Sequence, residues 1–498
     1  MQNNKNTNNE MKKHILFIPL LLCSIFLNAQ NITLDNSFGT SGFARLNETI
    51  VSSNGQSALQ SDGKIIILGN KNDNIIISRL NTNGTLDTTF GVNGYCTISN
   101  FNYQDLYALS VIENNIFVFV PYEKALLKVS SNGTIDNSFG TNGIMFYSTS
   151  EPYCPRYVID GNYLFVVKTD GVLDKINLLN GNIISSTPTN IANTKGIYRA
   201  PNNKLLLQSN QLSSGGNDMY DVNLTLLNYT GNIDNTFGTN GTIYLKTVNS
   251  NHFYDTLLNE GVVTDDSDNI FYASNTDPYD VFMLKKFSSN GVLDTTFATN
   301  GTYQDSGLVF MNYGEFTGLQ FSSNKIYIYG SHFLSLPNFN NDINMVVRRL
   351  NSDGTNDTSF NSTGKYIYNT NSYEEILSNF HLISPTSFLA SGYTFNVVDQ
   401  AQVDENQFFI GKFDITESTL SVNNSENQNV FYIENPVQSK LNFITKQPVS
   451  SIEIYTTDGK LVKTITKNNS EINIIKGVYI SKINFANGKT INKKLIKN

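Results

Sequence analysis

Several residue types are scarce in this chain of 498 residues, and each scarcity narrows its chemistry. There is no tryptophan, and only three cysteines and four histidines are present. So few cysteines exclude a disulfide-stapled scaffold, and no Cys-x-x-Cys or His-x-x-x-His pair is available for zinc. So few histidines also disfavour a catalytic histidine relay. Tryptophan, the strongest stacking platform for sugars, is missing altogether.

Charged residues and long apolar runs are also scarce. Charged residues make up 15% of the chain, whereas Asn, Thr, Ser, Gly, Tyr and Phe are abundant. This composition favours many short strands joined by polar turns over charged amphipathic helices. No segment reaches the roughly 20 consecutive apolar residues of a spanning helix. We therefore expect an all-β protein without a transmembrane segment.

The net charge is unevenly distributed along the chain. The formal charge of −8 is the balance of +2 in residues 1–29, −16 in residues 30–425 and +6 in residues 426–498. Because binding to nucleic acid requires a basic face, the strongly acidic central part argues against a nucleic-acid partner.

The N-terminus has the features of a secretory leader. Lys12, Lys13 and His14 precede an apolar run, Ile15 to Leu27, and a small residue, Ala29, follows. A basic segment, an apolar segment of that length and a small residue before the cut predict a signal peptide over residues 1–29. Cys23 would be the lipidated residue of a lipoprotein, but the bulky Leu22 before it disfavours that alternative. Of the remaining cysteines, we expect Cys96 and Cys154 to be free, with a disulfide between them as the alternative.

One phrase recurs through the central part of the chain. It reads Asn-Gly-Thr-Leu-Asp-Thr-Thr-Phe-Gly-Val-Asn-Gly at residues 83–94, and recognisable copies place an Asp and a Phe three residues apart. The pairs are Asp35 and Phe38, Asp87 and Phe90, Asp136 and Phe139, Asp234 and Phe237, Asp294 and Phe297, and Asp357 and Phe360. A decayed copy lies near residue 184. We expect each Asp to accept backbone N–H groups in a turn and each Phe to pack between neighbouring repeats.

The repeats predict a closed ring of four-stranded units. Each phrase follows a strand-like run, and a second turn signal such as Ser61-Asp62-Gly63 lies midway between phrases, so that each repeat contains about four strands. The array begins in mid-phrase at Leu34 and ends with a lone strand, Phe408 to Asp414. Pairing these two ends completes one unit and removes the exposed sheet edges. Seven markers predict a seven-bladed β-propeller over residues 30–416.

The phrase, its preceding strand and the Leu59 to Gly69 element together resemble the delta-60 repeat family, which is similar to β-propeller repeats of bacterial exported proteins. The resemblance implies the fold and brings no established activity.

The C-terminal part differs in composition from the repeats. After a Ser- and Asn-rich linker at residues 417–428, residues 429–498 are rich in Lys, Ile and Asn and alternate like strands, which predicts a small β-sandwich. The segments resemble the type IX secretion sorting domain (type A) of Bacteroidetes at Asn435, Pro436, Asp458, Gly459, Lys460, Gly477 and Tyr479. The resemblance implies recognition by the type IX secretion machinery, export across the outer membrane, and release or surface attachment.

No catalytic motif accompanies these features, so we predict no catalytic residue and no cofactor. Asp265, Asp266 and Asp268 cluster in one expected turn and are candidate Ca²⁺ ligands, with a solvated turn as the alternative. The segment Ser331 to Ile343 is expected to form a protruding loop, where binding often occurs.

The function expected from the sequence is that of a secreted or surface-attached, non-enzymatic propeller that binds a protein or glycan. Two alternatives stay open: a carbohydrate-active enzyme that uses Asp and Glu pairs, and a structural spacer.

Overall fold

The computed structural model describes the following residues: 30–45, 55–71, 74–99, 101, 108–120, 123–147, 156–168, 170–213, 219–249, 260–275, 281–305, 316–335, 341–369, 373–396, 407–417, 431–433, 436–445, 448–457, 459–468, 470–488 and 490–497. The predicted leader, residues 1–29, lies outside them, as does Cys154, whereas Cys96 is buried with a free thiol. The chain divides into two compact units, Met1–Glu417 and Ser418–Asn498.

All regular structure in the described residues is β, as the composition predicts. In the first unit, six four-stranded antiparallel sheets follow one another along the chain. Sheet 1 contains β3 (Gln56–Leu59), β4 (Ile65–Lys71), β5 (Asn74–Leu80) and β6 (Tyr95–Ser99); sheet 2 contains β7 (Ala108–Ile112), β8 (Asn115–Val120), β9 (Ala125–Val129) and β10 (Ile144–Phe146); sheet 3 contains β11 (Arg156–Asp160), β12 (Tyr163–Val167), β13 (Val172–Asn177) and β14 (Ile183–Pro188).

The remaining sheets of this series have the same plan. Sheet 4 contains β15 (Thr194–Ala200), β16 (Lys204–Leu212), β17 (Met219–Asn228) and β18 (Thr242–Asn249); sheet 5 contains β19 (Gly261–Thr264), β20 (Ile270–Asn275), β21 (Phe282–Phe287) and β22 (Thr302–Asp305); sheet 6 contains β23 (Phe316–Ser322), β24 (Lys325–Ser335), β25 (Asn341–Asn351) and β26 (Lys365–Tyr368).

A further sheet, the closing sheet, combines the two ends of the unit. It contains β27 (Tyr373–Ser384), β28 (Ser387–Asn396) and β29 (Gln407–Glu417), and β29 pairs with both β1 (Gln30–Leu34) and β2 (Phe43–Arg45). The register places Gln30 opposite Glu417 and Phe43 opposite Gly411. The sequence therefore predicts the closure correctly: the lone strand at the end of the array completes the phrase at its start.

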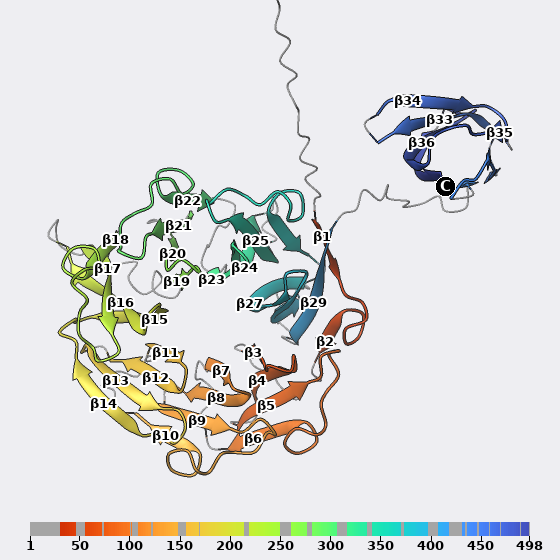
Figure 1. The fold of residues 1–498 in the computed structure, drawn as a ribbon. Helices are drawn as coiled ribbons and strands as arrows, with labels where there is room; N and C mark the ends of the chain where they lie inside the picture. The colour runs from red at the N-terminus through yellow and green to blue at the C-terminus, as the bar shows by residue number, and fades with distance from the viewer. Residues whose placement is uncertain are drawn as a thin grey trace, which may run out of the picture. The chain divides into compact units, whose positions relative to one another are not determined.

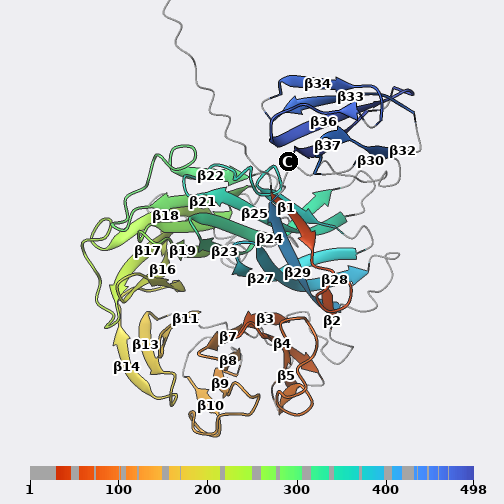
Figure 2. The same ribbon diagram turned by 45° about the vertical axis from the view of Figure 1, so that its right-hand side comes forward.

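The sheets stand around a ring, which Figures 1 and 2 show from two directions. Each of the core clusters in this unit combines side chains from two consecutive sheets. The closing sheet shares one cluster with sheet 6 and another with sheet 1, so the ring has no free end. Face-to-face packing of four-stranded sheets around an axis is the architecture of a β-propeller.

A belt of backbone hydrogen bonds joins neighbouring sheets. The residue after the phrase Phe donates its N–H to a turn carbonyl of the next sheet, as Gly91 does to Asn132 at 2.8 Å. The same bond joins Gly39 to Asn83, Gly140 to Asn180, Gly238 to Asn290, Ala298 to Asp353 and Asn361 to Gln30. Gln30 thus takes the place of a turn residue in the last of these bonds.

Two local expectations need correction. In sheet 3 the decayed copy near residue 184 is not a phrase: Ile183 and Ile184 begin strand β14, and a short turn connects it to β13. This segment lacks the Asp and Phe of the phrase and pairs with β13 as a strand instead. The expected loop from Ser331 to Ile343 is largely strand, because β24 and β25 stay paired out to Ser335 and Asn341; residues 336–340 lie outside the described residues.

The second unit is a small β structure with its own core. It contains β30 (Phe431–Ile433) paired with β32 (Phe443–Thr445), β31 (Lys440–Leu441) paired with β35 (Ser470–Glu471), and a four-stranded antiparallel sheet. That sheet has the order β34 (Leu461–Ile465), β33 (Val449–Thr456), β36 (Gly477–Phe485) and β37 (Thr490–Lys497). Its buried face packs Ile452, Ile454 and Leu495 into one hydrophobic cluster with Val437 and Leu441.

We predict that the phrase Phe is a main determinant of propeller stability. Phe90 is fully buried between sheets 1 and 2, so Phe90→Ala should lower the free energy of unfolding by roughly 3–5 kcal/mol. Urea unfolding followed by circular dichroism measures the change. Val92, two residues on and 76% exposed, offers the matched control, because Val92→Ala should change stability by less than about 0.5 kcal/mol. Equal effects of the two substitutions would contradict the prediction.

Candidate functional site

The repeated Asp residues all occupy one kind of site. Asp87 is representative: its Oδ1 accepts hydrogen bonds from the backbone N–H of Thr89 at 3.1 Å and from the Thr89 hydroxyl at 2.6 Å. Its Oδ2 accepts from Lys64 Nζ at 2.9 Å and Arg79 Nε at 2.8 Å. Asp35, Asp136, Asp234, Asp294 and Asp357 make the same Oδ1 bonds to the Ser or Thr two residues on.

A basic side chain neutralises each of these carboxylates. The ion pairs are Asp35 with Lys412, Asp136 with Lys128, Asp234 with Lys204, Asp294 with Lys286, and Asp357 with Lys325 and Arg349. Asp87 and Asp357 each have two cations and are also the most buried, at 4% exposure. This is expected, because burying a charge is costly unless it is paired and hydrogen-bonded.

The sequence analysis missed these cations, although a signal for them is present. In four repeats the cation lies eight residues before the Asp, in the preceding strand: Arg79, Lys128, Lys286 and Arg349. Asp234 has Leu226 at that position, and its partner Lys204 comes from the start of the second strand instead. The arginines also stack on the phrase Phe: the guanidinium carbon of Arg79 lies 4.9 Å from the Phe90 ring centroid.

The pairing lowers the pKa of the repeated carboxyl groups. Hydrogen bonds from Lys412 and Ser37 lower the pKa of Asp35 to about 2, and those from Lys204 and Thr236 lower the pKa of Asp234 to about 2. Burial works against the ionised form of Asp87, but the bonds from Thr89 and Lys64 outweigh it and hold its pKa far below the usual range. A glycosidase acid requires the opposite, a raised pKa.

The three candidate Ca²⁺ ligands do not converge. Asp265 uses both carboxylate oxygens within its own turn, accepting from the N–H groups of Ser267 and Asn269 and from the Asn269 side chain. Asp268 accepts from Asn202 of sheet 4 at 3.2 Å, and Asp266 is exposed. In the part of the chain that the structure describes, no group of three or more His, Cys, Asp or Glu residues could hold a metal ion.

A serine and a histidine meet where the ring closes. Ser57 Oγ lies 2.9 Å from His381 Nε2 and 2.7 Å from Ser391 Oγ, and the Ser57 N–H donates to Asn379 Oδ1 at 2.9 Å. Burial lowers the pKa of His381 to about 4, so the ring is neutral at physiological pH. Ser57 is only 4% exposed. A substrate therefore cannot reach this serine, and the cluster does not form a nucleophile site. Its hydrogen bonds instead join β3 to β27 and β28.

A buried carboxylate, Glu260, lies between sheets 4 and 5. Its Oε1 accepts from Lys246 at 2.9 Å and from Tyr272 at 2.7 Å, and its Oε2 accepts from Gln208. Burial and the adjacent Glu260 raise the pKa of Tyr272 well above its usual value. Nothing in the sequence pattern marks this residue, because Glu260 precedes its strand outside the repeated phrase. These contacts join strands of two neighbouring sheets, which is the pattern of a structural network.

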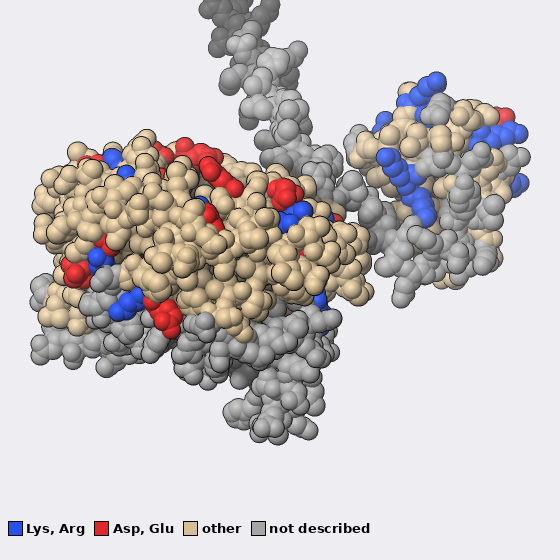
Figure 3. Space-filling view, turned by 90° about the horizontal axis from the view of Figure 1, so that it is seen from below, with Lys and Arg blue, Asp and Glu red and all other residues tan. Residues whose placement is uncertain are grey.

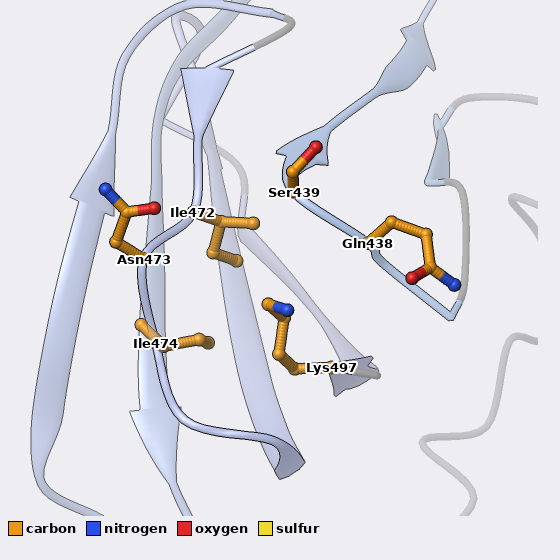
Figure 4. Close-up of a pocket in the computed structure, with 6 residues that line it drawn as sticks. All are labelled: Gln438, Ser439, Ile472, Asn473, Ile474 and Lys497. Carbon is orange, nitrogen blue, oxygen red and sulfur yellow. The ribbon is translucent and has the colours of Figure 1, made fainter.

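Two shallow hollows are bordered by polar groups. One, of about 300 Å³, lies between sheets 1 and 2 and is lined by Gln60, Asp62, Arg79, Asn114, Ser131 and Asn132. The other, of about 490 Å³, belongs to the second unit and is lined by Gln438, Ser439, Ile472, Asn473, Ile474 and Lys497 (Figure 4).

The structure describes five of the seven positions singled out in the C-terminal unit. Gly459 has a φ of 86° in the turn between β33 and β34, where the Thr456 N–H bonds to the Lys460 carbonyl at 2.9 Å. Tyr479 points into the core and donates its hydroxyl to the Ile475 carbonyl at 2.7 Å. Gly477 begins β36, and Pro436 is exposed. Asn435 and Asp458 lie outside the described residues.

We predict that acid weakens the propeller through the paired carboxylates. An unfolded Asp has a pKa near 3.9, whereas Asp35 and Asp234 have values of about 2 in the fold. Their stabilising contribution is therefore complete above about pH 4 and is lost as pH falls towards 2.

The double variant Asp35→Asn/Asp234→Asn should have a lower melting temperature than the wild type at pH 7. Between pH 4 and pH 2, its melting temperature should fall by less than that of the wild type. Melting curves across this range test the prediction, with the exposed Asp62→Asn as the control. Parallel pH profiles for the double variant and the wild type would exclude it.

Comparison with known protein families matches a segment of each unit. Residues 60–90 match the family described as "Domain of unknown function (DUF5122) beta-propeller", and residues 435–498 match the secretion system C-terminal sorting domain. No curated protein matches the chain. Similar solved structures include "The crystal structure of BamB from Moraxella catarrhalis", at 12% identity and a TM-score of 0.37 over 76% of this chain and 98% of that chain. Another is the computationally designed Ika8 protein, at 10% identity and a TM-score of 0.35 over 73% and 88%.

In the described residues, no helix has the length and apolar character needed to cross a bilayer. The sheet architecture and the two matched segments together describe a β-propeller protein that is similar to DUF5122 over residues 60–90, carries a type IX secretion sorting domain at its C-terminus, and is secreted or attached to the outer-membrane surface.

Proposed function

We propose that the secreted propeller is a non-enzymatic binding module that engages a protein or glycan through its surface. The observation that carries this proposal is that the repeated Asp carboxylates are all engaged in bonds within the ring. All six are held by a hydroxyl, a backbone N–H and at least one cation, so they stabilise the ring and are not available as acid–base pairs.

The electrostatics of the described residues support binding over hydrolysis. Where an Asp or Glu pKa is shifted in these residues, the shift is downward, as for Asp35, Asp136, Asp234, Asp294 and Asp357. A glycosidase needs one carboxyl group that stays protonated near neutral pH and a second one within about 5–10 Å of it. In the described part of the chain, no Asp or Glu has a pKa shifted upward in this way, so the glycosidase alternative has no candidate acid there.

The ring offers a rigid surface for recognition. Neighbouring sheets are joined by the belt of backbone bonds and by side-chain contacts, such as the Gln60 amide donating to the Asn114 carbonyl at 3.1 Å. These groups border the hollow between sheets 1 and 2, where amide, carboxylate and guanidinium groups lie together. Hydrogen-bonding groups on a rigid scaffold keep the entropic cost of binding low. This hollow is our candidate contact region for a polar ligand.

The proposal predicts binding without turnover. The secreted protein, collected from its producing cells, should bind at least one member of a glycan array or a surface-protein array, and no shortened product should appear in the same wells. Asn114→Ala should weaken the interaction about five- to thirtyfold if the hollow is the contact region, since one lost interface hydrogen bond costs about 1–2 kcal/mol.

Thr230→Ala, an exposed turn substitution in sheet 4, serves as the matched control and should bind like the wild type. Product release would establish the enzyme alternative, and the absence of binding in both arrays would favour the spacer.

A further inference from the structure

The four-stranded sheet of the sorting unit has one face in the core and one face in solvent. Ile452 and Ile454 of β33 are fully buried, as are Ile483 of β36 and Leu495 of β37. Since side chains alternate along a strand, Tyr455, Ile480 and Lys494 belong to the opposite face. Antiparallel sheets with one solvated face normally carry polar residues there.

Apolar side chains nevertheless lie next to one another on this solvent face. The register places Leu461 of β34 opposite Tyr455 of β33, and Tyr455 opposite Ile480 of β36. Directly opposed residues of neighbouring strands share a face and lie in contact range. Leu461 is 49% exposed, Ile480 is 42% exposed, and the adjacent Val478 is 47% exposed. We call Leu461, Tyr455, Val478 and Ile480 the apolar row.

The surroundings of the apolar row are positively charged. Lys494 of β37 continues the row beyond Ile480, and Lys482 lies two residues further along β36. One carboxylate, Glu453, lies on this face among the described residues. It accepts from the Tyr455 hydroxyl at 2.8 Å and pairs with Lys482 at 3.7 Å. The Tyr455 bond lowers the pKa of Glu453, which keeps this carboxylate ionised and engaged.

The net charge of the unit has the same sign. Residues 426–498 contain eleven Lys against four Glu and one Asp, a formal charge of +6. Lysine side chains, blue in Figure 3, are visible on the surface of this unit. Contiguous apolar residues rimmed by charge are typical of a protein–protein contact, and a basic rim attracts an acidic partner.

We propose that the apolar row is the surface by which the sorting unit docks on its export machinery, on a protein face with an apolar centre and an acidic rim. This inference rests on the sorting function of the domain. A protein partner fits better than a lipid surface, because the row is a short line of side chains on a rigid sheet with Lys482 and Lys494 beside it, whereas an interfacial membrane element needs a broad apolar face that inserts.

The test uses the full chain in a bacterium with a type IX secretion system, measuring the exported and the retained fractions by immunoblot. Ile480→Asp should lower the exported fraction about tenfold or more, because a charge replaces a side chain at the centre of the contact. Ile475→Asp is the matched control: it makes the same change at a side chain that is 83% exposed outside the sheet, and export should stay at the wild-type level.

A second variant guards against misfolding. Leu461 lies on the edge strand β34 and is 49% exposed, so Leu461→Asp should reduce export while the purified full chain gives the same urea unfolding curve as the wild type. Normal export of Ile480→Asp and Leu461→Asp would overturn the proposal. So would normal export accompanied by the loss of binding to phosphatidylglycerol vesicles, which would assign the row to a lipid surface.

Deletion of residues 429–498 distinguishes a failure of the sorting function from a failure of the docking surface. If the truncated chain is still exported, the sorting function itself fails. If the deletion abolishes export and the row variants do not, only the docking surface fails.

Discussion

Closure of the ring is the constraint on which the rest of the propeller depends. The closing sheet takes three strands from the end of the unit and its outer strands from the beginning, with Gln30 opposite Glu417. Asp35, the first marker of the chain, finds its cation in Lys412, 377 residues away. These long-range contacts must overcome a large loop entropy. In return, every sheet gains a neighbour on both faces, and both ends of the unit are held in paired strands.

The repeated phrase makes that closure rigid. Its Asp ties the turn to a cation of the same sheet, its Phe fills the space towards the next sheet, and the following N–H bonds to the next turn. Polar groups buried with complete sets of partners specify one arrangement, which suits a protein that works outside the cell. The same arrangement explains why abundant Asp does not imply catalysis here: the carboxylates are already neutralised by their own repeat.

The two units use charge in opposite ways. In the propeller, lysines and arginines are paired with the repeat carboxylates, and the unit as a whole is acidic. In the sorting unit, lysines outnumber acids, and they lie beside exposed apolar side chains on one sheet face. An acidic ring with its own core clusters and a small basic unit with its own core are consistent with a division between cargo and export signal.

Local chemistry allowed much of this molecule to be predicted from its sequence. Strand runs, Asn-Gly turns and the period of the phrase predict an all-β ring. The incomplete copies at Leu34 and Phe408 predict how it closes, because pairing the two part-sheets removes their exposed edges. The structure decided what depends on distance. Lys204 replaces the missing cation of Asp234, β14 replaces the decayed phrase, Glu260 finds buried partners on other strands, and Asp265 turns inward on its own backbone. Each of these outcomes depends on which side chains the folded sheets bring together, and that is a property of the tertiary structure rather than of any local pattern.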